Sequence, residues 1–499
     1  MEHLPVASIL VFLPLAGAFL LVPVWKSPEL ARRFALGTAL LELALVGYLF
    51  SAMSATVGTA TPLPGFFLWE DLPWIGRIGI RYTLGMDGIT LLLGFLTAFV
   101  TVVAMLVSWR AIGERVAFHY FLLLVMESGI MGVFLALDLF LFYLFWEVML
   151  VPMFFLIGIW GHGRRIYSAV KFFLFTLFGS LLMLLAIIGV YLIHGSQTGS
   201  YTFALSALTT TRIAPGVACW LFAAFLLAFA IKVPLFPLHT WLPDAHTDAP
   251  TAGSVVLAGL LLKTGAYGLI RFAYPLFPEA ARMFTPVLLA AAVIGIIYGS
   301  WVAYAQTDMK RLVAYSSVGH MGFVALGIAA WTPVSLSGSV LQMVNHGITT
   351  GALFALVGML DERTGTREIG AFGGLWGKVP LFAAFFLLFS MASAGLPGLN
   401  NFAGEFLVLA GSFRAFPLPA VLAIIGIALP LVYTVRLVQE VLFVTERQCF
   451  VQSDLSRREG GVLGVLAIVA VYLGVHPAPL LAILKLPVAL LTAGAGGMP

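Results

Sequence analysis

The stretch Ile231–His246 reads IKVPLFPLHTWLPDAH, and the stretch Ala392–Phe406 reads ASAGLPGLNNFAGEF. Each places proline, and in the second stretch glycine also, inside a long apolar segment and beside an ionisable residue. Proline removes a backbone donor and clashes with the preceding helical turn. Unpaired backbone at membrane depth is tolerated only inside protein or along a wet cavity. Both stretches therefore predict interrupted transmembrane helices with ion sites at the breaks; two proline kinks in packed helices are the structural alternative.

The composition around these stretches is that of a membrane protein. The 499 residues are 61% hydrophobic and only 10% charged, which excludes an ordinary water-soluble fold. A bilayer core about 30 Å thick needs roughly 20 apolar residues per helical crossing. About fourteen stretches meet this need, at 5–25, 32–52, 87–109, 117–137, 138–160, 167–194, 215–238, 250–271, 283–304, 310–331, 335–360, 378–412, 417–444 and 460–482.

We therefore predict an all-α polytopic protein with a single membrane domain, 1–499. The largest polar pieces, 53–86, 361–377 and 445–459, are too short to hold a soluble catalytic domain. The broken helices are the seventh and the twelfth, and this regular spacing predicts a transporter built from two repeats. After the fourteenth helix we expect only a short tail.

The loop charges predict the orientation. Loops on one side hold fifteen Lys and Arg residues, and loops on the other side hold six. The basic side should be cytoplasmic. An even number of crossings then places both termini on the periplasmic side.

Glu147 and Lys232 are the first two candidate site residues. Glu147 lies in FWEVMLVP with apolar residues on both sides, and Lys232 directly precedes the first break. A charge at this depth is expensive and usually functional. At an effective dielectric constant near 20, stretching such an ion pair from about 4 to 8 Å costs roughly 2 kcal/mol. The pair can therefore act as a proton switch; a structural hydrogen bond from Glu147 and a snorkelling Lys232 are the alternatives.

Four more ionisable residues lie in apolar spans and complete the candidate proton relay, namely Lys263, His320, His346 and Glu405. Histidine shuttles protons readily near neutrality. Glu405 follows the second break and is a candidate terminal exchange group. The alternatives are a snorkelling lysine, satisfied structural histidines and a helix-capping glutamate. Weaker candidates are Glu127, Asp138, Lys171, His239, Asp244, His246 and Asp248.

Cofactor sites are not expected on this chain. Its two cysteines, Cys219 and Cys449, are too few for an Fe–S cluster or a structural zinc site. No Gly-rich phosphate loop or dinucleotide fingerprint is present, and no run of basic residues suggests nucleic acid. His320 and His346 lack a third ligand at metal-binding spacing.

Several of these stretches resemble one known family, the antiporter-like membrane subunits of respiratory complex I and of the Mrp antiporters. The most specific is KVPLFPLHTWLPDAHTDAPTAGSVVLAGLLLKTGAYGLIRF, Lys232–Phe272. FWEVMLVPMFFLIGIWG, LVAYSSVGHMGF and LPGLNNFAGEF are similar to the same family. Glu405 resembles the M-type branch, because the sister L and N types usually carry lysine there. The stretch LNNF, Leu399–Phe402, departs from the commoner pattern.

The resemblance implies fourteen helices with two inverted five-helix repeats, 117–271 and 283–444, flanked by 5–109 and 460–482. It implies a charge pair of Glu147 with Lys232, proton transfer along Lys263, His320 and His346, and exchange at Glu405. It further implies a bacterial inner membrane and partnership with L- and N-type subunits in a proton-translocating NADH:quinone oxidoreductase. The flavin, Fe–S clusters and quinone would lie on other subunits.

Three other assemblies would use similar residues. A Mrp-type Na⁺/H⁺ antiporter shares the broken helices and the Glu–Lys pair, although Glu405 is less typical of it. An energy-converting hydrogenase or a ferredoxin-linked complex would contain the same pump with a different electron donor. A purely structural spacer is disfavoured by the row of buried ionisable residues.

Overall fold

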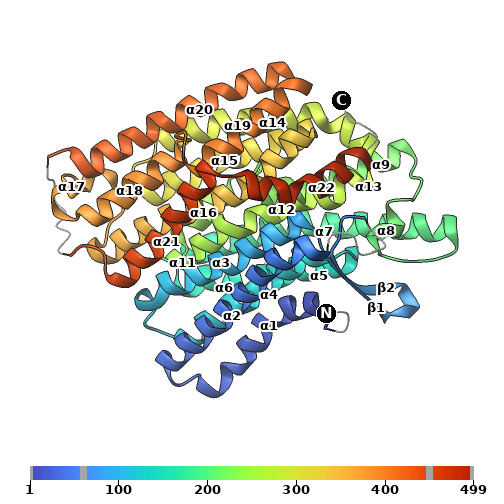
Figure 1. The fold of residues 1–499 in the computed structure, drawn as a ribbon, viewed down its shortest axis with the longest axis horizontal. Coiled ribbons are helices and arrows are strands. Elements are labelled where there is room, and N and C mark those ends of the chain that lie inside the picture. Colours follow the sequence, from blue (N-terminus) through green and yellow to red (C-terminus); the bar gives the residue numbers. More distant parts are fainter. Residues whose placement is uncertain (1–3, 57–63, 446–452, 495–499) are drawn as a thin grey trace.

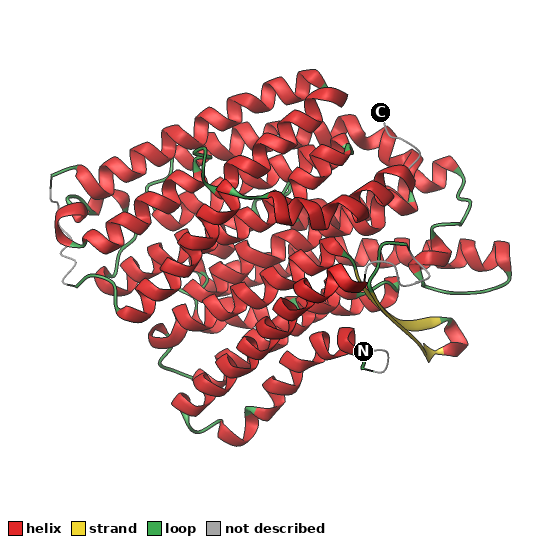
Figure 2. Ribbon diagram, viewed as in Figure 1, coloured by secondary structure: helices red, strands yellow, loops and turns green. Residues whose placement is uncertain are grey.

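The computed structural model describes residues 4–56, 64–445 and 453–494. Long helices lie side by side in one bundle, and Figure 1 shows the first two helices along one edge and the last two across the middle of the bundle. Helix accounts for nearly all of the regular structure in Figure 2. Cys449 lies outside the described residues.

The first half of the chain forms α1 (Val6–Leu20), η1 (Val22–Val24), α2 (Pro28–Thr56), β1 (Leu68–Ile75), η2 (Gly76–Ile78), β2 (Ile80–Met86), α3 (Gly88–Ala111), α4 (Val116–Leu135), α5 (Leu139–Val148), α6 (Leu150–Trp160), α7 (Arg165–Thr198), α8 (Leu205–Leu208), α9 (Pro215–Lys232) and α10 (Trp241–Asp248). The second half forms α11 (Thr251–Val256), η3 (Leu257–Leu261), α12 (Leu262–Gly268), η4 (Leu269–Ala273), α13 (Tyr274–Leu276), α14 (Pro278–Tyr304), α15 (Met309–Ala330), α16 (Pro333–Thr364), η5 (Ile369–Ala371), α17 (Leu375–Lys378), α18 (Pro380–Ser393), α19 (Asn400–Ala415), α20 (Pro417–Val438), η6 (Gln439–Phe443), α21 (Arg457–Val475) and α22 (Ala478–Gly494).

The all-α membrane architecture is confirmed. Within the described residues, 13 helical segments are long and apolar enough to cross a bilayer, and they coincide with thirteen of the predicted stretches. The remaining stretch, 378–412, is divided into α18 and α19, which are each shorter than a full crossing. The count of fourteen crossings and the two inverted repeats therefore stay predictions.

One polar piece contains a structure that the sequence analysis missed. Within 53–86, β1 pairs with β2 in an antiparallel hairpin, which projects from one end of the bundle in Figure 1. The turn uses Gly79 at a φ of 70°, a left-handed conformation that glycine adopts without steric cost. Glu70 of β1 accepts a hydrogen bond from the backbone N–H of Ala7 at 2.6 Å and so caps the first turn of α1.

The prediction of only a short tail after residue 482 is wrong. α22 continues to Gly494 and packs against α3 and α16. Gly88 permits this contact, because a Cβ there would lie 2.2 Å from the carbonyl oxygen of Ile483. The apolar sequence of α22 packs against these neighbours despite Pro487 within the helix.

The interior of the bundle is formed by the spans that carry the candidate site. The run from α11 to α13 and the middle of α16 are buried within the chain, and α15 is nearly so. By contrast, α2, α20 and α21 are mostly exposed on their outer faces. Lys263 and His346 therefore lie where protein, rather than lipid, surrounds them.

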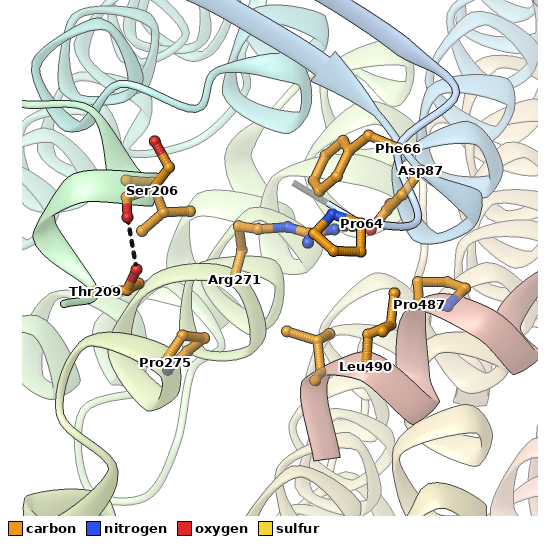
Figure 3. Close-up of a pocket in the computed structure, with 11 residues that line it drawn as sticks. Pro64, Phe66, Asp87, Ser206, Thr209, Arg271, Pro275, Pro487 and Leu490 are labelled. Carbon is orange, nitrogen blue, oxygen red and sulfur yellow. Dashed lines mark hydrogen bonds and ion pairs between the residues drawn. The ribbon is translucent and has the colours of Figure 1, made fainter. Parts of the chain in front are cut away.

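A buried ion pair ties the hairpin region to this interior. Asp87 caps α3 by accepting a hydrogen bond from the Thr90 N–H at 2.9 Å, and it also pairs with Arg271 of η4. Arg271 lies over the ring of Phe66 at 5.1 Å. Figure 3 shows these groups beside a pocket of about 240 Å³ that reaches α8 and α22 and includes no predicted relay residue.

Removing the buried carboxylate should destabilise the subunit strongly. In Asp87→Ala, Arg271 keeps its charge without its partner, so we expect a loss of about 3–5 kcal/mol. The thermal unfolding midpoint of this chain in the purified complex measures the effect.

The matched control is Asp71→Ala in the hairpin. Burial opposes ionisation of Asp71, but hydrogen bonds from Arg81 and Thr83 outweigh it and lower the pKa of the carboxyl group. The control therefore removes a fully formed ion pair at neutral pH. Because this pair is partly exposed, we expect a loss below about 1 kcal/mol. Equal shifts in the two variants would contradict the account.

Candidate functional site

The first helix break brings Lys232 to the end of a helix deep in the protein. α9 ends at Lys232, and the chain resumes helical structure only at Trp241. The indole N–H of Trp241 donates to the carbonyl of Ile231 at 2.8 Å, and the N–H of Leu235 donates to the carbonyl of Ala230 at 2.9 Å. These bonds satisfy helix-end carbonyls that the prolines would leave unpaired. The prediction of an interrupted seventh helix is confirmed.

Lys232 is held by aromatic rings. Its side chain is fully buried, and its Nζ has no hydrogen-bond partner within the described part of the chain. The Nζ lies 5.4 Å from the ring centre of Trp146 and 5.3 Å from that of Phe172. Attraction to two desolvated ring faces stabilises an ammonium group. Gly265 permits this packing, since a Cβ there would lie 2.9 Å from the Lys232 Cβ.

Glu147 lies next to this lysine without pairing with it. It follows Trp146 in α5, and its Oε1 is buried with no hydrogen-bond partner among the described residues. No ion pair within 4.0 Å joins Glu147 to Lys232. The structure therefore has the two groups of the predicted switch on neighbouring helices, in a separated arrangement.

Lys263 and His346 are in direct contact at the centre of the bundle. Lys263 lies in α12, directly after the π-helical segment η3. Its Nζ donates to the carbonyl of Ala258 and lies 2.6 Å from Nδ1 of His346. A π-helical turn widens the helix and frees carbonyl groups, which is why such turns often occur at functional sites.

His320 and Glu405 form the next contact of the row. Nδ1 of His320 lies 2.8 Å from Oε1 of Glu405, and Nε2 lies 3.2 Å from the hydroxyl of Ser393. The rings of His320 and His346 are 5.7 Å apart, centre to centre. Four of the six predicted residues therefore form a continuous buried row, Lys263–His346–His320–Glu405, which we call the central relay.

The second break is built around the glutamate. Between α18 and α19, Gly395 has a φ of 76° and Gly398 a φ of 92°. Both values lie in the left-handed region that favours glycine. A Cβ on Gly395 would lie 3.3 Å from Oε2 of Glu405. The prediction of an interrupted twelfth helix is confirmed, and the break allows backbone to approach the carboxylate closely.

Three amides that the sequence analysis missed fix this arrangement. Asn345 donates to the carbonyl of Asn400 at 2.7 Å, and Asn400 donates to the carbonyl of Asn345 at 3.0 Å. Gln342 donates to Glu405 at 3.0 Å. Asn400 belongs to the stretch LNNF, which departs from the commoner family pattern, and its bonds with Asn345 join the start of α19 to α16. The recurrence of Gln342, Asn345, His346 and Thr349 at helical spacing is a signal that could have revealed a polar face.

The fifteen basic residues counted above in the cytoplasmic loops include Lys310, and this assignment is wrong. Lys310 lies in α15, is 2% exposed, and donates to the carbonyl of Ala249. Nearby, His246 is fully buried with neither ring nitrogen bonded among the described residues, and it stacks on Phe354 at 4.5 Å. The sequence did not indicate this burial, because Lys310 stands beside Arg311 at the start of an apolar stretch, where a cytoplasmic loop is expected to end.

The weaker candidates have mostly structural contacts. Lys171 pairs with Asp244 at 2.6 Å, and Asp248 accepts from Ser168 at 2.6 Å. Asp138 caps α5 by accepting from the N–H of Phe140 at 3.0 Å. These four side chains are satisfied within the chain.

Comparison with known proteins now gives the family. Residues 136–429 match the family model described as "NADH:quinone oxidoreductase/Mrp antiporter, TM". NADH-quinone oxidoreductase subunit M of Pseudomonas aeruginosa is 45% identical over 95% of this chain and 94% of its own length. The chain belongs to the NADH:quinone oxidoreductase/Mrp antiporter family.

Solved structures agree with this membership. A chain of respiratory complex I from Thermus thermophilus is 34% identical, with a TM-score of 0.86 over 98% of this chain and 100% of that chain. A chain of the Mrp complex from Dietzia sp. DQ12-45-1b has a TM-score of 0.85 over 97% of each chain at 20% identity, a likeness of fold alone. Within the family the chain is of the M type, as Glu405 predicts.

The Trp241 indole hydrogen-bonds across the first helix break, and replacing it should make local unfolding of that break more frequent. In Trp241→Phe the ring contact with Phe172 at 5.3 Å can persist, but the carbonyl of Ile231 loses its donor. A buried carbonyl without a partner costs about 1–3 kcal/mol. We expect faster amide hydrogen exchange between residues 229 and 246, measured by mass spectrometry of the purified complex.

The control is Trp301→Phe, because Trp301 is 65% exposed in α14. This variant should leave exchange between 229 and 246 unchanged. Unaltered exchange in Trp241→Phe would contradict the role given to the indole.

Proposed function

We propose that this chain is a proton-translocating, non-redox subunit in the membrane arm of an NADH:quinone oxidoreductase. The observation that carries the proposal is the central relay, in which polar contacts join Lys263 to His346 and His320 to Glu405, with the two histidine rings 5.7 Å apart inside the bundle. Groups of this kind at membrane depth are typical of proton pathways. The complex I relatives support the choice of assembly.

The driving step is a change in the distance between Glu147 and Lys232. In the observed arrangement the lysine faces Trp146 and Phe172 rather than a carboxylate. Movement of Glu147 from about 8 to 4 Å would favour the ammonium form by roughly 2 kcal/mol at an effective dielectric constant near 20. A charge displacement in a neighbouring subunit that moves Glu147 would thus load or release a proton at Lys232.

The proton released from Lys232 passes to the central relay. Gly265 brings α12, which carries Lys263, against the end of α9. Lys263 then hands a proton to His346 at their 2.6 Å contact, and His320 passes it to Glu405. Glu405, beside the second break, exchanges the proton with the membrane exterior or with the adjoining subunit.

The assembly and location follow from the same proposal. The partners are sister antiporter-like subunits of the L and N types, and the electron carriers lie on other chains. The membrane is a bacterial inner membrane, with the basic loops in the cytoplasm and both termini on the periplasmic side. Mrp-type antiporters and ferredoxin-linked complexes are distinguished by the chains that copurify and by a requirement for Na⁺.

Neutralising Glu147 tests the driving step. In Glu147→Gln, the side chain keeps its size but cannot attract the ammonium of Lys232. We expect NADH:quinone reductase activity and proton pumping to fall together in sealed vesicles, by about tenfold or more, while a native gel shows normal assembly.

Glu114→Gln is the matched control, because Glu114 is exposed in the loop before α4. It should retain both activities. If Glu147→Gln also keeps normal reductase activity and normal pumping, the charge switch is refuted. If vesicles that contain the wild-type complex pump Na⁺ instead of protons, the hypothesis of a Mrp-type Na⁺/H⁺ antiporter subunit replaces this proposal.

A further inference from the structure

Lys310 is a buried lysine outside the central relay. It lies in the first turn of α15, is 2% exposed, and donates to the carbonyl of Ala249 in the link between α10 and α11. Lysine is almost never fully buried unless it is paired. No carboxylate of the described residues lies within 4.0 Å of the Lys310 amine. The position therefore calls for a role other than that of an ion pair.

Charged groups at the surface of the bundle lie beside this lysine. Asp308 precedes α15 and pairs with Arg367 at 3.2 Å, and Arg367 also lies 3.9 Å from Asp361. The side chains of Asp308 and Asp361 are 18% and 27% exposed, and both are close enough to Lys310 to interact electrostatically. In the orientation proposed above, the start of α15 faces the cytoplasm. A proton from the cytoplasm can therefore reach Lys310 over polar groups rather than through lipid.

His246 is the titratable residue that neighbours both Lys310 and the central relay. It is close enough to interact electrostatically with Lys310 and with Lys263. Ala249, which accepts the Lys310 hydrogen bond, follows His246 by three residues, about one helical turn. The His246 side chain is fully buried, and neither ring nitrogen has a hydrogen-bond partner within the described chain. Buried polar groups of this kind typically bind ordered water.

A strip of polar atoms runs from His246 to the central relay along α16. The His246 ring stacks on Phe354 at 4.5 Å. His346, Thr350 and Phe354 are spaced four residues apart and so share one face of α16. On that face Oγ1 of Thr350 and Nε2 of His346 are buried and make no hydrogen bond to any described residue. The strip spans eight residues, about 12 Å along the helix, which a few bound water molecules can bridge.

We propose that Lys310 and His246 form the cytoplasmic entry of the proton path and feed the central relay at His346. Each proton that leaves at Glu405 must be replaced, and this route supplies the replacement from the cytoplasm. Thr350 holds the water that bridges His246 and His346. The inference rests on the proposed function, because a relay that moves no protons needs no entry.

Each transfer along this route conserves atoms and charge. A hydronium ion at the surface gives its proton to the neutral amine of Lys310, where an N–H bond forms and a water molecule is left. That N–H bond breaks next, the amine keeps the electron pair, and the proton passes over bound water to one ring nitrogen of His246. The imidazolium then releases the proton of its other ring nitrogen toward Nε2 of His346 and returns to the neutral ring.

Three variants of the assembled complex test this entry. Lys310→Met removes the proton carrier, Lys310→Arg keeps the positive charge but does not release a proton, and His246→Phe keeps a ring that can stack on Phe354. In sealed vesicles supplied with NADH, we expect proton pumping to fall at least about tenfold in each variant, as on removal of a proton-transferring group. The ratio of turnover in H₂O to turnover in D₂O should rise, because proton entry becomes the slow step.

Lys26→Met, at an exposed lysine before α2, is the control and should pump as the wild type does. A native gel checks assembly, and if Lys310→Met fails to assemble, the other two variants decide. Normal pumping in Lys310→Arg or in His246→Phe would overturn the inference, and so would a loss of pumping without a rise in the isotope ratio. Failure of wild-type vesicles to pump protons with NADH would instead overturn the proposed function, so the two failures are distinguishable.

Discussion

The cost of holding charge away from water governs this structure. Lys263 is fully buried, and its amino group is stabilised by the carbonyl of Ala258 and the ring of His346. Each contact requires a neighbour in a particular place: a π-helical turn before Lys263, and α16 against its side. Since an unpartnered charge would cost several kcal/mol, the surrounding helices must adopt this packing for the lysine to be present.

The two helix breaks solve the same problem in different ways. In the first, an indole and a backbone N–H satisfy the carbonyls left by the prolines, and aromatic rings face Lys232. In the second, glycines at positive φ let the backbone approach Glu405, while Asn345 and Asn400 bond reciprocally across α16 and α19. The first break thus leaves its lysine without a hydrogen bond to any described residue, whereas the second fixes its glutamate. From this asymmetry we infer that the Lys232 end is the adjustable part of the proposed proton pathway.

The sequence predicted the helices and the six ionisable residues because hydropathy and isolated charge are local signals. Thirteen predicted stretches match helical spans, and four of the six residues meet in the central relay. The partners of these residues were not predictable, because Gln342 and Asn400 act across helices that are far apart in the chain. The hairpin was missed because its two strands lie in a polar piece between two predicted spans. Lys310 was misassigned because a charged helix start resembles a loop.

The central claim is that protons move through Lys263, and one measurement tests it directly. Lys263→Met keeps the length of the side chain but removes the proton carrier. The number of protons pumped per NADH oxidised is measured in sealed vesicles that contain the assembled complex, beside Lys26→Met at an exposed lysine. The account predicts that Lys263→Met lowers this ratio or stops turnover, while Lys26→Met behaves as wild type. An unchanged ratio at normal turnover in Lys263→Met would contradict it.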